Sequence, residues 1–144
     1  LRIFGYEFKG HLAKIDCIDS FFTANMELLD PAVKEELFHR GGPVYTKIRD
    51  EVPTYYGPDA VVKNSSVADG CVIEGELENC VLSRGVRVGR GAVVKNSIIM
   101  QGTQILSGVH LNYVITDKDC VLRDNRVLTG HRSYPVLLRK GSVV

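Results

Sequence analysis

Aliphatic residues recur every six positions through the C-terminal two-thirds of this chain. The series consists of Leu82, Val88 and Val94, then Ile99, Ile105 and Leu111, then Ile115, Val121 and Val127. Glycines such as Gly85 and Gly102 stand three residues after a member of the series, where a chain can turn tightly. A period of six is neither the 3.6 of an amphipathic helix nor the alternation of a half-buried strand. It predicts short strands that each send one side chain inward and are joined by corners.

A longer repeat contains the period of six. The segment 61–65, Val-Val-Lys-Asn-Ser, returns at 93–97, and asparagines stand at 64, 79, 96 and 112, which are 15, 17 and 16 residues apart. Three strands of about six residues form one triangular coil, and a spacing near 16 implies one shortened corner where Asn tolerates positive φ. We therefore predict a mainly β fold, a parallel β-helix over 51–144, with aliphatic side chains piled in its interior.

The first 50 residues carry helix signals instead. Ser20 or Asp19 is expected to cap a helix that runs through Leu29, and Asp30 followed by Pro31 starts a second short helix. The run Gly41-Gly42-Pro43 should stop it. We expect 1–50 to be the end of a preceding domain plus a helical linker, because the chain also begins without Met in apolar, strand-like sequence.

Composition excludes several classes of function. The net charge is +1, which gives no reason to expect a nucleic-acid or membrane-surface partner, and no apolar run is long enough to cross a membrane. No signal peptide is visible. The cysteines Cys17, Cys71, Cys80 and Cys120 form no CxxC pair or zinc-like cluster, so we expect four buried, reduced thiols, in keeping with the cytoplasm.

The six-residue period resembles the hexapeptide-repeat family of left-handed β-helices, which includes acyltransferases and the C-terminal domains of sugar nucleotidyltransferases. Three segments, 15–29, 93–102 and 135–141, resemble bacterial ADP-glucose pyrophosphorylase (glucose-1-phosphate adenylyltransferase). The resemblance implies an assembly and regulatory domain of an oligomeric cytoplasmic enzyme of glycogen biosynthesis. It implies no catalytic residue and no cofactor in this chain, since Mg²⁺ belongs to the family's catalytic domain.

One departure from that family points to a non-catalytic subunit. His11 stands where catalytic subunits carry an aspartate that binds the metal. A neutral imidazole is a poor ligand for Mg²⁺, which prefers hard oxygen atoms. The chain therefore resembles the regulatory subunit type of Gram-positive bacteria, whose partners would be the catalytic subunit or further copies of itself.

Candidate site residues are cationic. Lys118 resembles a family lysine that binds anionic effectors, and Arg139 and Lys140 lie near a second one, so these three are candidates for a phosphorylated small-molecule effector. Arg84, Arg87 and Arg90 are weaker candidates for an anion patch or a subunit contact. Solvated surface charge is the simpler interpretation of both sets.

Two alternative functions stay open at the level of sequence. A hexapeptide acyltransferase would use His110 or His131 as a general base between subunits, although a 50-residue linker has no use there. The β-helix of another sugar-1-phosphate nucleotidyltransferase, of the guanylyl or thymidylyl type, is the second alternative.

Overall fold

A computed structural model describes residues 1–40, 42, 44–45 and 48–144 of the chain. Two positions of the expected helix stop, Gly41 and Pro43, lie outside the described residues. Within the described part, no helix combines the length and the apolar character that a membrane crossing requires.

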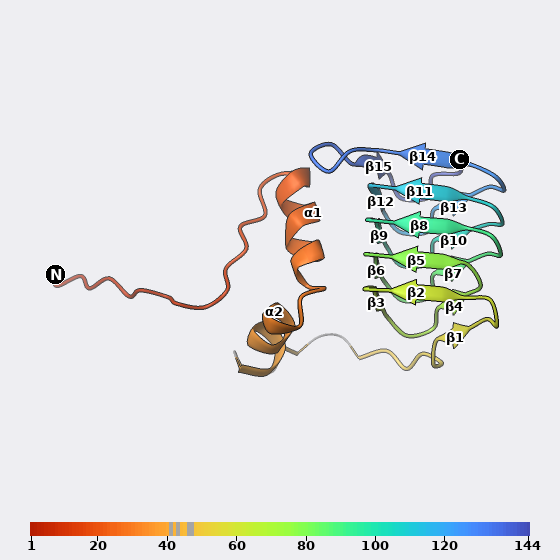
Figure 1. Cartoon of the computed structure of the whole chain (residues 1–144). Helices are drawn as coiled ribbons and strands as arrows, with labels where there is room; N and C mark the ends of the chain where they lie inside the picture. Colours follow the sequence, from red (N-terminus) through yellow and green to blue (C-terminus); the bar gives the residue numbers. More distant parts are fainter. Residues whose placement is uncertain (41, 43, 46–47) are drawn as a thin grey trace.

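The strands form three parallel sheets of five strands each, which wind into a β-helix (Figure 1). Sheet A contains β1 (Tyr55–Tyr56), β4 (Val72–Ile73), β7 (Arg87–Val88), β10 (Gln104–Ile105) and β13 (Val121–Leu122). Sheet B contains β2 (Val61–Lys63), β5 (Glu76–Glu78), β8 (Val93–Lys95), β11 (His110–Asn112) and β14 (Val127–Thr129). Sheet C contains β3 (Ser66–Val67), β6 (Val81–Leu82), β9 (Ile98–Ile99), β12 (Val114–Thr116) and β15 (Val136–Leu138).

The winding is left-handed. In Figure 1 the strands of sheet B run from right to left in front while the stack rises from β2 to β14, and the chain returns behind them. Each coil contributes one strand to each sheet, so strand order in a sheet follows every third strand of the chain. The predicted β-helix is confirmed.

The interior is largely aliphatic, as the period of six predicts. Ile99 and Ile105 are 0% and 1% exposed. In sheet A, register stacks Ile73, Val88, Ile105 and Leu122 on one another. One cluster of buried aliphatic residues and thiols fills the stack from Cys71 to Leu122. This pile of side chains from successive coils is the core that no single coil could bury alone.

The expected series is one residue out of phase in the fourth coil. Thr116, not Ile115, is in register with Ile99, and Leu122 follows it inside. The reason is that Tyr113, not Asn112, occupies the corner between sheets B and C in this coil, so that the next inward residue after Leu111 is Thr116. Ile115 therefore points outward, and Val121 and Val127 do so as well, the latter 66% exposed.

Thr116 is tolerated in the core because its hydroxyl is satisfied. Its Oγ1 accepts a hydrogen bond from the backbone N–H of Met100 at 3.2 Å. The hydroxyl oxygen of Thr103, also buried, lies 3.3 Å from it and 3.3 Å from the carbonyl oxygen of Asp117. A buried polar group with partners costs little, whereas an unpaired one would be expensive.

The same corner explains the recurring asparagines. Asn64, Asn79 and Asn96 have φ values of 42°, 53° and 47°, in the left-handed region. The expected fourth member, Asn112, is in register with Lys95 instead, and Tyr113 takes the corner with φ 53°. The alignment by residue type was therefore wrong at this coil, because a tyrosine occupies the corner there.

One coil is two residues shorter than the next. Leu77 follows Val62 by 15 residues in register, whereas Val94 follows Leu77 by 17. The short path passes Gly75, where a Cβ atom would lie only 2.4 Å from the carbonyl oxygen of Ala92. Only glycine lets the two backbones approach this closely.

Helix α1 (Ile18–Glu27) lies along the outer face of sheet C, running across its strands (Figure 1). Phe22 is 4% exposed and packs on Ile98 and Ile115, so the helix buries the outward residues of β9 and β12. Phe21 and Met26 flank this contact. Burying a phenylalanine side chain contributes about 1.5–3 kcal/mol, so this contact favours the docking of the helix on sheet C.

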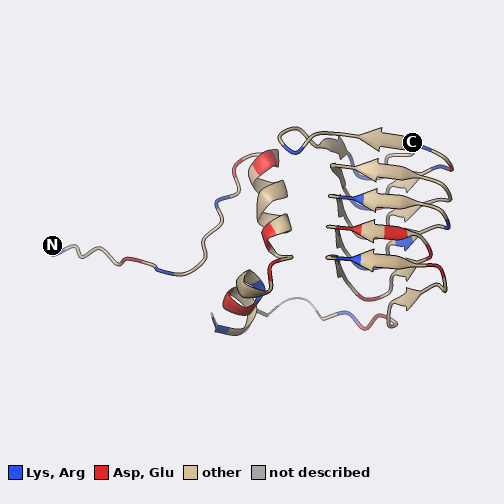
Figure 2. Cartoon of the chain, in the orientation of Figure 1, with Lys and Arg blue, Asp and Glu red and all other residues tan. Residues whose placement is uncertain are grey.

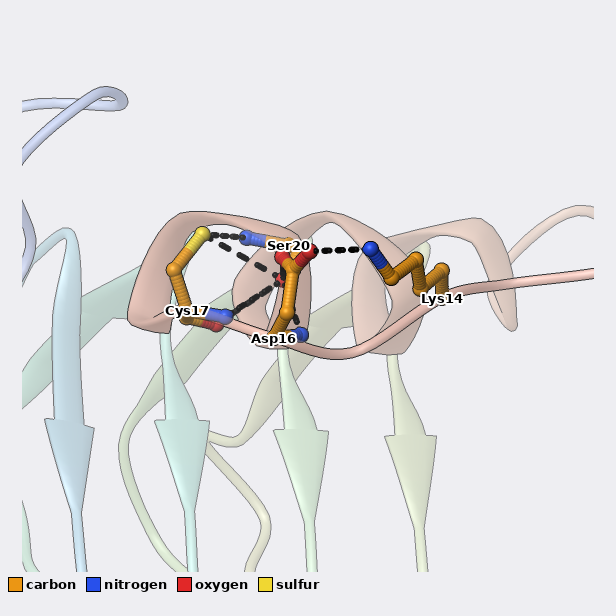
Figure 3. Close-up of polar contacts among 4 residues, drawn as sticks. All are labelled: Lys14, Asp16, Cys17 and Ser20. Atoms are coloured by element: carbon orange, nitrogen blue, oxygen red, sulfur yellow. Dashed lines mark hydrogen bonds and ion pairs between the residues drawn. The ribbon is translucent and has the colours of Figure 1, made fainter.

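The cap of α1 differs from both expected residues. Cys17 is the N-cap, and its Sγ accepts from the backbone N–H of Ser20 at 3.4 Å, while the Ser20 Oγ accepts from the Cys17 N–H at 3.0 Å (Figure 3). Lys14 and Asp16 form a 3.0 Å ion pair beside this capping box, which lowers the pKa of Asp16. Ser20 thus serves at the third helical position rather than as the cap.

The second helix begins as predicted. Asp30 caps α2 (Pro31–Glu35), its carboxylate accepting from the Ala32 N–H at 2.8 Å, and a π-helical turn, η1 (Glu36–Arg40), continues it. Residues 1–9 before these helices are exposed, including Phe4 and Tyr6 at 85% and 89%.

Three of the four cysteines are buried thiols, and the fourth is not. Cys71, Cys80 and Cys120 are at most 1% exposed, and each donates to a carbonyl of a neighbouring coil. Burial raises the pKa of the Cys80 thiol to about 11 and also raises those of Cys71 and Cys120. Cys17 is exposed, because it caps a helix that lies on the outside of the stack.

Candidate functional site

The predicted effector lysines meet at one corner of the stack. Backbone hydrogen bonds join successive coils there: Gly102 N–H to Arg84, Asp119 N–H to Gln101, and Gly141 N–H to Lys118, at 2.9–3.1 Å. The residue before each donor stands at the same corner. The column reads Asp69, Arg84, Gln101, Lys118 and Lys140, because the Asp69 carbonyl accepts from the Gly85 N–H at 3.2 Å in the same way. We call Arg84, Gln101, Lys118 and Lys140 the basic corner. Neighbouring coils are about 4.8 Å apart, so the long side chains of Lys118 and Lys140 can reach one anion together.

A groove of about 520 Å³ links this corner to helix α1. Arg84, Gln101 and Lys118 line one side of it, and Phe21 and Asn25 of α1 line the other. Two cations from different candidate sets therefore share one groove, with two amide side chains available as further donors. Among the described residues, neither Arg84 nor Lys118 is in an ion pair.

The other cationic candidates lie elsewhere. Arg139 precedes Lys140, and its carbonyl accepts from the Cys120 thiol at 3.2 Å. Arg87 faces outward from β7 in sheet A. Arg90 stands at the far corner of that sheet, where its Nε lies 3.3 Å from Glu74 Oε1. The spacing of three thus distributes Arg84, Arg87 and Arg90 across the width of sheet A, and only Arg84 joins the groove.

Charges on sheet B neutralise one another. Lys63, Glu78 and Lys95 are neighbours in register, and Figure 2 shows the two signs alternating from β2 to β5 to β8. Lys95 Nζ lies 2.8 Å from Glu78 Oε2, a contact that lowers the pKa of Glu78 and raises that of Lys95. This sheet therefore offers no concentrated charge for an anion.

The histidines lie apart from one another and from the groove. His110 points outward from β11. His131 lies in the loop before β15, where its Nδ1 is 2.9 Å from Ser133 Oγ and its ring centroid is 6.5 Å from that of Tyr113. His11 Nε2 lies 3.4 Å from Glu27 Oε2 of helix α1, so its side chain is engaged in holding the N-terminal segment to that helix.

Gln101 and Asn25 are the residues of this groove that the sequence did not suggest. A sequence signal for Gln101 existed. In each coil the residue at this corner is followed by a residue with positive φ, namely Gly85, Gly102, Asp119 and Gly141. No local pattern marks Asn25, since it reaches the groove only by the docking of α1 on sheet C.

Comparison with known proteins agrees with this architecture. A family model described as GlmU-like, C-terminal hexapeptide matches residues 52–132. "Glycogen biosynthesis protein GlgD" of Bacillus subtilis (strain 168) is 47% identical over 143 residues, 99% of this chain and 42% of the relative. GlgD of Geobacillus stearothermophilus is 50% identical over 120 residues, 83% of this chain and 35% of the relative. "Glucose-1-phosphate adenylyltransferase" of Geobacillus stearothermophilus is 43% identical over 94 residues, 65% of this chain and 24% of the relative. The chain thus spans less than half the length of these relatives.

Proposed function

The chain belongs to the GlmU-like, C-terminal hexapeptide family, and we propose that it is the assembly and regulatory domain of a glucose-1-phosphate adenylyltransferase subunit in glycogen biosynthesis. The observation that carries the proposal is the similarity to a glycogen biosynthesis protein along nearly the whole chain. The cytoplasm is the compartment that this role requires.

The subunit is of the non-catalytic type in this proposal. His11 replaces a carboxylate that the resemblance assigns to metal binding, and its imidazole pairs with Glu27 instead. Mg²⁺ would bind only in a catalytic domain, where oxygen ligands suit it. The chain itself requires no cofactor for an assembly role.

Association with the catalytic subunit, or with a second copy, would use sheets A and B or the ends of the stack. Helix α1 already covers sheet C, leaving Ile98 and Ile115 at most 3% exposed. The outer faces of sheets A and B keep exposed apolar side chains, among them Tyr55 and Val127. Such side chains within a mixed polar surface suit a subunit interface.

The basic corner would bind a phosphorylated effector of this enzyme. Arg84 and Lys118 present cations to one groove, neither of them in an ion pair with another residue of the described part, and Gln101 and Asn25 add neutral donors. A phosphate accepts such charge-assisted hydrogen bonds strongly. Because Asn25 belongs to α1, a bound anion would also contact the helix that leads towards residues 1–17.

The test of the assembly role is an assay of ADP-glucose synthesis. The whole open reading frame that encodes this chain would be assayed alone and mixed with the glucose-1-phosphate adenylyltransferase of the same cell. We expect no synthesis alone, and in the mixture a shared elution volume with a changed rate or effector response. Full activity of the isolated protein, or no association, would contradict the proposal.

The effector site is tested on this chain by calorimetry with fructose 1,6-bisphosphate and with inorganic phosphate. Replacing a cation that donates to phosphate should weaken binding about tenfold, for Arg84→Gln and for Lys118→Gln alike. Arg126→Gln is the matched control, since Arg126 is exposed and lies outside the groove. Equal affinity in all three variants would remove the basic corner from the proposal.

A further inference from the structure

A second groove, of about 730 Å³, lies on the other flank of helix α1. One wall is the corner between sheets B and C, with the side chains of Asn64, Asn79 and Asn96 in a row. The opposite wall is α1, through Phe22 and Met26 among others, and Tyr113 lies beside the upper asparagine. We call it the amide groove. Its size lies within the range of small-molecule sites, which are mostly apolar with a few placed polar groups.

The three amides form a ladder with spare hydrogen-bonding capacity. Asn64 Nδ2 donates to Asn79 Oδ1 at 2.7 Å, Asn79 Nδ2 to Asn96 Oδ1 at 3.2 Å, and Asn96 Nδ2 to Asn112 Oδ1 at 2.9 Å. A primary amide has two N–H donors and an oxygen with two lone pairs. Asn79 and Asn96 each use one donor and one lone pair in the ladder. Each of these two side chains therefore keeps one N–H and one oxygen lone pair for a ligand. The free groups of Asn79 and those of Asn96 are about 4.8 Å apart, the spacing of neighbouring coils.

Aromatic rings lie next to this polar row. The Phe22 and Tyr113 ring centroids are 6.0 Å apart at an interplanar angle of 49°, and Tyr113 is only half-buried. A ligand along the ladder would therefore meet paired donors and acceptors on one side and apolar ring surface on another. Hydroxyl groups both donate and accept, so a polyhydroxylated ring with apolar faces matches both walls.

The charges at the groove select against anions. Its charged lining residues are two carboxylates, Glu27 and Asp30, and one guanidinium, that of Arg132. This is the reverse of the groove at the basic corner, on the opposite flank of α1, whose charged lining residues are the two cations Arg84 and Lys118. Anionic ligands are therefore disfavoured, and a neutral ligand fits the amides and rings of this lining.

We propose that the amide groove is a binding site for a neutral oligosaccharide of glucose units, aligned along the asparagine ladder. The site itself is inferred from the geometry of the groove, and the choice of glucose as the sugar depends on the proposed role in glycogen biosynthesis. It would place a regulatory subunit in contact with a glucose polymer.

The experiment is a titration of the protein with maltohexaose, followed by calorimetry and by the side-chain amide signals in NMR spectra. The amide signals of Asn79 and Asn96 should shift, and that of Asn125 should not. Asn79→Gly should raise the Kd about tenfold. Glycine accepts the positive φ of that corner, so the variant removes the amide and keeps the backbone conformation.

Asn125→Gly is the matched control, because Asn125 also has a positive φ, 59°, but stands at a different corner outside the groove. Its Kd should equal that of the unmodified protein. An anionic oligosaccharide of the same length should bind at least about tenfold more weakly, given the two carboxylates. No binding of maltohexaose at millimolar concentration, equal Kd in the two glycine variants, or equal binding of the anionic sugar would overturn the proposal. None of these readouts needs an adenylyltransferase, so the outcome is distinct from that of the assembly assay.

Discussion

Replacing Ile99 by aspartate should unfold the β-helix at neutral pH. Ile99 is 0% exposed and stacks between Leu82 and Thr116 of the adjacent coils. Removing the aliphatic side chain from the core costs about 2–3 kcal/mol. A carboxyl group in that position avoids the burial of a charge by staying protonated in the folded state. Protonating a group with an ordinary pKa of about 3.9 at pH 7 costs about 4 kcal/mol of folding free energy. Together these reach the lower range of a domain's whole stability, about 5–15 kcal/mol.

The assay is urea unfolding followed by far-ultraviolet circular dichroism at pH 7 and pH 4.5. The buried carboxyl has a pKa raised above its unfolded value, so the folded state binds the extra proton and the destabilisation shrinks as the pH falls. Gln104→Asp is the control, because Gln104 precedes the buried Ile105 on β10 but faces solvent, and its effect should stay within about 0.5 kcal/mol. An unchanged midpoint for Ile99→Asp at pH 7 would refute the placement of Ile99 in the buried interior.

Three further changes test other contacts in the chain. Phe22→Ala should cost about 3 kcal/mol and free α1 from sheet C, seen as faster hydrogen exchange of the α1 backbone amides, and an unchanged exchange rate would contradict the packing described. Near pH 8, Ellman's reagent should label Cys17 rapidly and the three buried thiols only on unfolding, because burial shields those three from the reagent and raises their pKa values. A second rapid thiol would be inconsistent with the burial. Gly75→Ala should cost about 2 kcal/mol in urea melts because its Cβ would meet the Ala92 carbonyl, whereas Gly5→Ala, with nothing within 4 Å, should have no effect.

The β-helix could be predicted from sequence because the six-residue period of aliphatic residues recurs in its coils. Ile99 and Ile105 were placed correctly by counting sixes from their neighbours. The error at Ile115 arose because the fourth coil was aligned on Asn112, whereas Tyr113 occupies its corner, and because a threonine is not expected in an aliphatic core. Only its hydrogen bond from Met100 and its contact with Thr103 make Thr116 acceptable inside.

The candidate sites were harder to predict, because they depend on which coils and helices come together. Lys118 was expected from resemblance, but its partnership with Arg84 requires the register that aligns 84, 101 and 118 at one corner. The amide ladder was visible as a repeat of asparagines, yet the sequence assigned them a backbone role alone. Their function as one wall of a groove appears only when α1 lies beside them, and no sequence pattern states where a helix docks.

The docking of α1 also changes how the solenoid can come apart. In a stack of coils each coil touches only its neighbours, so the ends are free to fray one coil at a time. Helix α1 packs through Phe22 on Ile98 of β9 and Ile115 of β12, which belong to adjacent coils. It also lines one groove with Leu137 of β15 near its start and another with Asn64 near its end. If either of these two coils opens, it must also release a helix that the other coil holds. This longitudinal coupling converts a chain of nearest-neighbour contacts into one cooperative unit, and it should equalise the free energies of hydrogen exchange in the central coils.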